Sequence, residues 1–147
     1  MLALAIYPEG TTTSGDYILK FKKGAFASLL PLKPLVMINN LDENFHLSGM
    51  VGMTLQFARA HLYLYHNIRI YDLPVVTPND FMYAKYRETH PELTEKWEIY
   101  AEVMRDIMCE YSGLKKSNMN FRDSLDYESL LFGLKDPQII LNEKKNL

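Results

Sequence analysis

The stretch YPEGTTTSG, residues 7–15, decides the fold that the sequence predicts. A continuous apolar run, residues 2–7, leads into it and stops at Pro8. A run this short that ends at a proline predicts a strand buried on both faces. The glycines, threonines and serine that follow Glu9 predict a tight turn of the kind that usually lies inside a domain. We therefore expect the chain to open with a strand and a turn from the middle of a domain.

Apolar spacing predicts alternating helices and strands after the turn. Residues 18–30 place apolar side chains on one side and lysines on another, which predicts an amphipathic helix that ends at Pro31. The apolar run 32–38 predicts a second strand. The long apolar segment 45–65 predicts a helix weakened by its glycines, and the alternating segment 67–76 predicts a third strand.

The rest of the sequence predicts three more helices. One starts at residues 78–80, and the clearest covers 91–112, where apolar side chains from Leu93 to Met108 recur at helical spacing. Residues 123–132 predict a further short helix. Their acidic side chains lack the spacing and the central glycine of a calcium loop, so we expect a helix start there and no metal site.

This order of elements predicts an α/β fold with an incomplete, mainly parallel sheet and crossover helices. We place one partial domain at residues 1–134 and a polar tail at residues 135–147. An uncovered edge of a buried-type strand invites aggregation. We therefore expect a protein partner, or a segment upstream of this sequence, to complete the sheet.

The composition narrows the function classes. The 147 residues carry a net charge of -2, so bulk charge gives no argument for binding nucleic acid. The single cysteine, Cys109, cannot form an internal disulfide, and its place in a predicted helix suggests an inert, partly buried thiol. No uninterrupted apolar run approaches the roughly 20 residues of a membrane span.

Three segments resemble the glycerolipid acyltransferase family, and most closely its lysophosphatidylcholine acyltransferase branch. In YPEGTTTSGDYILKFKKGAF, residues 8–11 match the family's Pro-Glu-Gly-Thr turn and residues 23–26 match its Lys-Gly-Ala-Phe segment. The stretch PLKPLVM, residues 31–37, matches a following strand with its two prolines, and residues 103–133 resemble the end of the domain. The chain thus looks like the carboxy-terminal half of an acyltransferase domain.

The resemblance implies transfer of an acyl group from acyl-CoA, the co-substrate, to the hydroxyl of a lysophospholipid or glycerol phosphate, with no other cofactor. Backbone N–H groups and hydroxyls at the mouth of a crossover can hold a glycerol phosphate. The alternative is a plain turn in which glycine supplies a permissive backbone and the threonines cap a helix. The acceptor-binding residues that the resemblance implies are Glu9, Gly10, Thr11, Thr12, Pro31 and Pro34.

The sequence departs from the family in two places. The family often has an arginine where Thr12 stands, so direct charge pairing with phosphate is not expected there. The family also implies a His-x4-Asp motif, in which the histidine is the general base and the aspartate orients it. None of the four histidines here has an aspartate five positions later. The nearest imitation, His90 with Glu95, lies in the wrong order along the chain, so we predict no catalytic residue.

Two functions remain open, with a third, weaker one behind them. The chain is part of a lysophospholipid acyltransferase whose general base comes from outside this sequence, or a catalytically inactive, acyltransferase-derived subunit with a structural role in a membrane assembly. The weaker option is an unrelated small α/β protein. The resemblance further implies association with an intracellular membrane, that of the endoplasmic reticulum or the mitochondrion.

Two other segments have alternative interpretations. The basic cluster Lys20, Lys22 and Lys23 suits either lipid phosphates at a membrane surface or a solvated helix face, and the second is favoured. Residues 45–65 suit either a helix in the membrane interface or a buried crossover helix.

Overall fold

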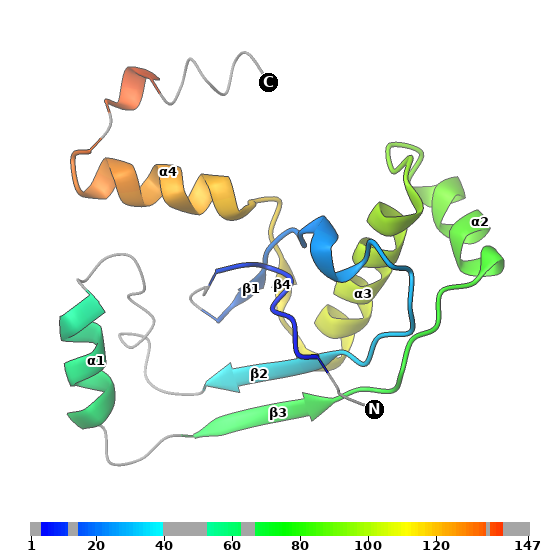
Figure 1. The fold of residues 1–147 in the computed structure, drawn as a ribbon, viewed down its shortest axis with the longest axis horizontal. Coiled ribbons are helices and arrows are strands. Elements are labelled where there is room, and N and C mark those ends of the chain that lie inside the picture. Colours follow the sequence, from blue (N-terminus) through cyan, green and yellow to red (C-terminus); the bar gives the residue numbers. More distant parts are fainter. Residues whose placement is uncertain (1–3, 12–14, 40–52, 63–66, 135, 140–147) are drawn as a thin grey trace.

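The computed structural model describes residues 4–11, 15–39, 53–62, 67–134 and 136–139, and all structural statements below concern these residues (Figure 1). The chain is mixed α/β, as predicted. Its elements, in order, are β1 (Tyr17–Ile18), the 3-10 turn η1 (Lys23–Ala25), β2 (Leu35–Asn39), α1 (Met53–Leu62), β3 (Ile68–Asp72), α2 (Asp80–Thr89), α3 (Lys96–Ser112), β4 (Lys115–Lys116) and α4 (Phe121–Leu131).

The prediction of a mainly parallel sheet is wrong. The described strands form two separate pairs, and only the short pair β1–β4 is parallel. Strands β2 and β3 pair antiparallel, with Met37 opposite Ile70, and an isolated bridge between Leu32 and Val76 extends the pairing. Helix α1 lies beyond the end of this ribbon rather than across its face, so the chain returns beside the strand it left (Figure 1).

Two elements predicted near the amino terminus are also wrong. Residues 4–7 form no strand, and Leu4 and Tyr7 are 83% and 82% exposed. Residues 18–30 form no α-helix, and their one helical element is the 3-10 turn η1. Their backbone donors are used over long range instead: Lys20 N donates to Met119 O at 3.1 Å and Lys22 N donates to Pro8 O at 2.8 Å. Tertiary hydrogen bonds therefore replace the helical ones that the apolar spacing suggested.

The helices of the carboxy-terminal part confirm the sequence patterns. Asn79 caps α2 by accepting a hydrogen bond from Met82 N. Helix α3 begins at Lys96, later than predicted, because Glu95 and Glu98 form a reciprocal capping box. It ends at Gly113, whose left-handed φ of 75° suits glycine.

The core lies where α3 meets the segment 18–26. Ile99 and Tyr100 of α3 are fully buried, and Phe26 packs edge-to-face on Tyr100 at 5.5 Å between ring centroids. The Tyr100 hydroxyl donates towards the carbonyls of Leu30 and Val76, which ties the core to the start of the β2–β3 ribbon. Each fully buried large side chain contributes about 1.5–3 kcal/mol.

Several predictions fall partly on residues outside the described set. Helix α1 confirms the centre of the predicted helix 45–65, and the rest of that segment lies outside. Of the predicted polar tail, only residues 136–139 are described, and they are exposed. Among the described helices, none combines the length and the apolar character needed to cross a bilayer.

Candidate functional site

The turn at Pro8 to Gly10 is shaped by glycine. Gly10 has a φ of 71°, in the left-handed region that L side chains rarely adopt, and its N–H donates to Tyr7 O at 3.2 Å. The hydrogen bond from Lys22 N to Pro8 O fixes the turn against the segment that follows β1. This local geometry explains why the sequence places glycine after Glu9.

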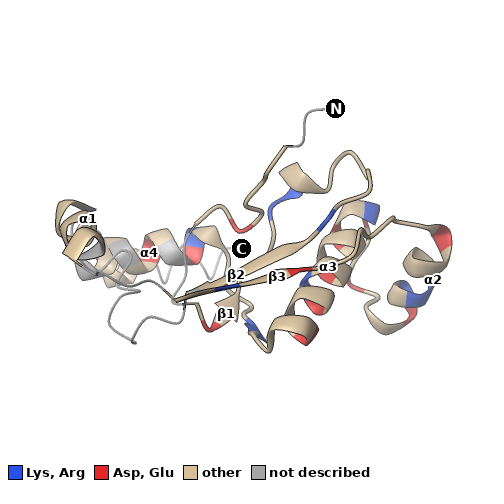
Figure 2. Ribbon diagram, turned by 90° about the horizontal axis from the view of Figure 1, so that it is seen from below, with Lys and Arg blue, Asp and Glu red and all other residues tan. Residues whose placement is uncertain are grey.

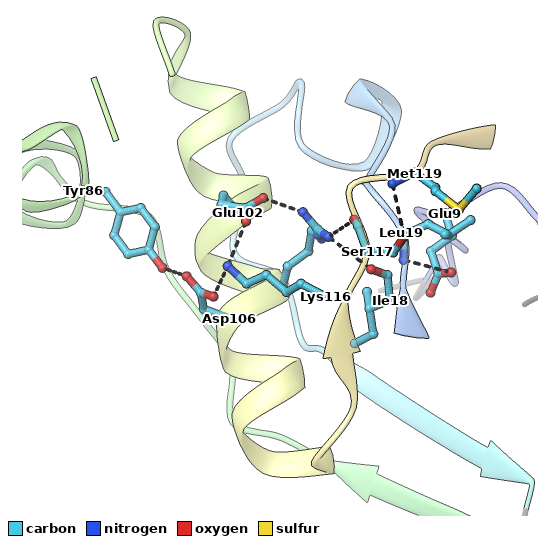
Figure 3. Close-up of polar contacts among 10 residues, drawn as sticks. Glu9, Ile18, Leu19, Tyr86, Glu102, Asp106, Lys116, Ser117 and Met119 are labelled. Atoms are coloured by element: carbon cyan, nitrogen blue, oxygen red, sulfur yellow. Dashed lines mark hydrogen bonds and ion pairs between the residues drawn. The ribbon is translucent and has the colours of Figure 1, made fainter. Parts of the chain in front are cut away.

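The carboxylate of Glu9 contacts the backbone of the segment that follows β1. Its Oε2 accepts a long hydrogen bond from Leu19 N at 3.5 Å (Figure 3). Burial raises the pKa of Glu9, while the Leu19 N–H and the charge of Arg105 act in the opposite direction. The side chain therefore holds the turn against β1.

Arg105 completes this arrangement from the other side of the same peptide group. The side chain is buried, and its Nη2 donates to Ile18 O at 3.1 Å and to Ser117 O at 2.7 Å. The Ile18 carbonyl and the Leu19 N–H belong to one peptide unit. A guanidinium at its carbonyl end and a carboxylate at its N–H end polarise that unit in the same sense, which strengthens both hydrogen bonds. Within the described chain, Arg105 Nε is a buried nitrogen with no partner.

A charged network on α3 supports Arg105. Arg105 Nη1 donates to Glu102 at 2.8 Å, and Lys116 of β4 contacts both Glu102 and Asp106. The Tyr86 hydroxyl of α2 donates to Asp106. Burial opposes ionisation of Glu102, but the hydrogen bonds and charges of Lys116 and Arg105 prevail and lower its pKa. The network thus joins α2, α3 and β4 around the guanidinium (Figure 3).

Lys22 lies directly over the turn. A Cβ added to Gly10 would overlap the Lys22 ammonium, so a larger residue would have to displace the end of this flexible side chain, and it is the left-handed φ that favours glycine. The Lys22 Nζ also lies 3.6 Å from the ring centroid of Phe121 at the start of α4. The neighbouring Lys23 forms an ion pair with Glu95 at 3.3 Å, so the predicted basic cluster does not act as one group.

The other predicted acceptor residues are divided between two parts of the chain. Glu9, Gly10 and Thr11 lie together on the turn, whereas Thr12 lies outside the described residues. Pro34 is buried and its carbonyl accepts from Leu73 N at 3.2 Å, so the hydrogen bonds of this segment tie it to the β3 side rather than to the turn. Pro31 is exposed, next to the bridge that starts the ribbon.

The histidine–carboxylate imitation at His90 and Glu95 is not assembled as a pair. The His90 ring stacks on Tyr86 and its Nδ1 lies 2.9 Å from the Thr89 hydroxyl. The Glu95 carboxylate accepts from Trp97 and from the start of α3. The two groups therefore have separate structural partners.

Sequence reasoning missed Arg105 and the particular position of Lys22. Arg105 carried a signal, because a charged residue on the buried face of an amphipathic helix requires a partner. Nothing in the local sequence distinguishes Lys22 from Lys20 or Lys23, because its position depends on the folded turn.

Comparison with known proteins gives relatives of one kind. The chain is 29% identical over 134 residues to a lysophospholipid acyltransferase of Arabidopsis thaliana. This alignment covers 88% of the chain and 30% of the relative. It is 30% identical over 123 residues to lysophosphatidylcholine acyltransferase 1 of Homo sapiens, and 26% identical over 122 residues to the lysophosphatidylcholine acyltransferase of Drosophila melanogaster. Each of these two alignments covers 82% of this chain.

The same comparisons set the scale of the similarity. The chain spans 21% of the human and Drosophila relatives and 30% of the plant relative. No family model matches the chain, and no solved structure matches it significantly. The resemblance to the lysophospholipid acyltransferases that the motifs predicted is confirmed.

Proposed function

We propose, from its similarity to the lysophospholipid acyltransferases, that this chain is a segment of such an enzyme and carries its acceptor-binding turn. The observation that supports this most is the turn itself. Gly10 adopts a backbone that glycine favours, and Glu9 and Arg105 hold the two ends of one peptide group beside it. Because a turn fixed in this way is already ordered, it loses little conformational entropy when it binds and positions a substrate.

The reaction defines what such a turn has to do. The acceptor hydroxyl attacks the thioester carbonyl of acyl-CoA, the new ester C–O bond forms, and the C–S bond breaks to release CoA. A general base takes the hydroxyl proton, and the departing sulfur is protonated. Holding the acceptor hydroxyl in line with the thioester is the contribution expected of this chain. The base is expected from a His-x4-Asp motif outside this sequence, because these 147 residues contain none.

The residues have different roles in this proposal. Glu9 holds the turn through Leu19, and Gly10 and Thr11 face the acceptor. Thr12 extends the same turn, and Pro31 and Pro34 shape the acceptor site from the β2 side. The roles of Thr12, Pro31 and Pro34 come from the family resemblance alone.

Acceptor kinetics of the native protein that contains this chain test the proposal. We expect Thr11→Val to raise the KM for lysophosphatidylcholine or lysophosphatidylethanolamine about tenfold, the usual effect of one lost polar contact, with the KM for acyl-CoA unchanged. Ser28→Ala, which likewise removes one hydroxyl but at an exposed position outside the turn, is the control. An unchanged acceptor KM in the Thr11 variant contradicts the proposal.

A second candidate is an inactive, acyltransferase-derived subunit in a membrane assembly, which applies if no polypeptide of the native assembly carries a His-x4-Asp motif. Purifying the native assembly and identifying every polypeptide in it separates the two. A polypeptide that carries His-x4-Asp, joined to this chain or bound beside its Glu9 turn, supports the enzyme. A complete assembly without that motif, and without acyl transfer, supports the structural subunit.

A further inference from the structure

We propose that the ammonium of Lys22 is the cation that binds the phosphate of the acceptor at the Gly10 turn. The identity of the ligand rests on the proposed function, whereas the position of the cation rests on contacts within the chain. No local sequence pattern singles out this lysine.

The backbone fixes where Lys22 starts. Its N–H donates to Pro8 O at 2.8 Å, so the residue is tied to the turn that contains Glu9 and Gly10. The side chain then passes over Gly10, where a Cβ would overlap the ammonium and the carbon next to it. The missing side chain of Gly10 thus leaves room for a positive charge directly at the turn.

An aromatic ring holds the ammonium in this place. The Lys22 Nζ lies 3.6 Å from the Phe121 ring centroid, within the range of a cation–π interaction. The ring face is a weak acceptor that engages one side of the ammonium. The remaining N–H donors of Lys22 stay available to an anion.

The charges around Lys22 do not neutralise it. Lys23 is already paired with Glu95, whereas Lys22 has no ion pair with a carboxylate in the described part of the chain. The nearby carboxylate of Glu9 accepts from Leu19 N and experiences the opposing charge of Arg105. A phosphate at the turn consequently meets the Lys22 charge, while the Glu9 carboxylate of the same turn has the Leu19 N–H and the Arg105 charge as its partners.

A lysine suits this ligand chemically. An ammonium is a compact charge that binds phosphate oxygens without demanding a two-pronged geometry. It therefore accepts both the dianion of a glycerol phosphate and the monoanion of a lysophospholipid, and it binds the dianion more tightly.

Selective isotope labelling gives a direct test, because Glu9–Gly10 is the single Glu–Gly pair in the sequence. Labelling glutamate at its carbonyl carbon with ¹³C and glycine with ¹⁵N selects the amides of glycines that follow a glutamate, and the signal that is lost in Gly10→Ala is assigned to Gly10. The native protein that contains this chain is titrated with glycerol 3-phosphate, and the Gly10 shift gives the apparent Kd. The same titration with glycerophosphocholine shows whether a monoanionic lipid headgroup is also bound.

Three variants isolate the charge. Lys22→Met keeps the apolar stem over Phe121 but removes the charge, and Lys22→Arg retains it. Lys20→Met removes an exposed charge two residues away. We expect Lys22→Met to weaken glycerol 3-phosphate binding about tenfold, as for one lost charged hydrogen bond, and the other two to change it less than about threefold.

Each result has a definite meaning. Binding that shifts Gly10 and weakens only in Lys22→Met supports the inference. Binding that shifts Gly10 equally in the wild type and Lys22→Met overturns the role of Lys22 but leaves the acceptor turn in place. If both glycerol 3-phosphate and glycerophosphocholine leave the Gly10 amide unmoved, the acceptor turn is overturned, and the role of Lys22 with it.

Discussion

The part of the molecule around α3 and the β2–β3 ribbon differ in how they are held. Around α3, apolar side chains are buried and a charged network surrounds Arg105, with acidic and basic residues interspersed along α2 and α3 (Figure 2). On the ribbon, Met37 and Ile70 lie opposite each other and are 56% and 59% exposed. The comparison teaches that the turn is anchored in the well-packed part of the chain, whereas the ribbon gains little from packing on its apolar face.

Core truncation gives the largest expected contrast between the two regions. Phe26→Ala removes a ring buried against Tyr100, and we expect it to lower the free energy of unfolding by about 3–5 kcal/mol. Met37→Ala on the exposed face of the ribbon is the matched variant, and about 0.5 kcal/mol or less is expected. Urea unfolding of both variants measures the difference, and equal losses would show that the ribbon face is packed as well as the core.

Removing the buried guanidinium is expected to have the next largest effect. Arg105→Met leaves the carbonyls of Ile18 and Ser117 without their donor and Glu102 without one partner. We expect a loss of about 3 kcal/mol in the free energy of unfolding. Faster hydrogen exchange at the Leu19 amide should accompany it, because the turn and β1 are held through that peptide. Protection at Leu19 that survives the substitution argues against the peptide link between Arg105 and Glu9.

Gly10→Ala tests the turn with a smaller change. An L residue at a φ of 71° costs about 1–2 kcal/mol, and the added methyl also displaces the Lys22 ammonium. Gly24→Ala is the control, since a Cβ there meets nothing within 4 Å. Comparing the two variants by thermal unfolding separates the turn requirement from the general effect of replacing a glycine. Equal stabilities would mean that the turn does not depend on Gly10.

The pH dependence of stability gives the smallest effect and has opposite signs at two glutamates. The pKa of Glu102 is lowered from its ordinary value near 4.5. Its contribution to the free energy of unfolding is therefore present above that pH and is lost as the pH falls through the lowered pKa. The pKa of Glu9 is raised, so its contribution is present below 4.5 and is lost as the pH rises through the raised pKa.

Unfolding in urea from acidic to neutral pH measures these two contributions. Relative to the wild type, Glu102→Gln should lose stability towards neutral pH, and Glu9→Gln should gain it over the same range. Parallel curves for the two variants would rule out the opposite shifts.

The comparison also shows which features a sequence can reveal. Helix α3 was predictable because its apolar spacing and the terminal Gly113 are local, although its start was predicted too early because the capping pair Glu95 and Glu98 was overlooked. The segment 18–30 was mispredicted because Lys20 and Lys22 donate to distant carbonyls rather than within a helix. Local patterns carry no information about such partners.

The candidate site follows the same division. Its turn was found from the sequence, because the Pro-Glu-Gly-Thr motif is contiguous. The contact between Arg105 and the Ile18 carbonyl joins residues 87 positions apart, and the place of Lys22 over Gly10 depends on a left-handed backbone. Neither could be inferred before the chain was folded.

Photolabelling tests the central claim, an acceptor bound at the Gly10 turn, most directly. A lysophosphatidylcholine with a photoreactive group on its headgroup is cross-linked to the native protein, and the labelled tryptic peptide is identified by mass spectrometry. We predict labelling of the peptide that ends at Lys20 and contains Glu9, Gly10 and Thr11, suppressed by unlabelled lysophosphatidylcholine. Labelling that unlabelled acceptor suppresses only at other peptides would contradict an acceptor site at this turn.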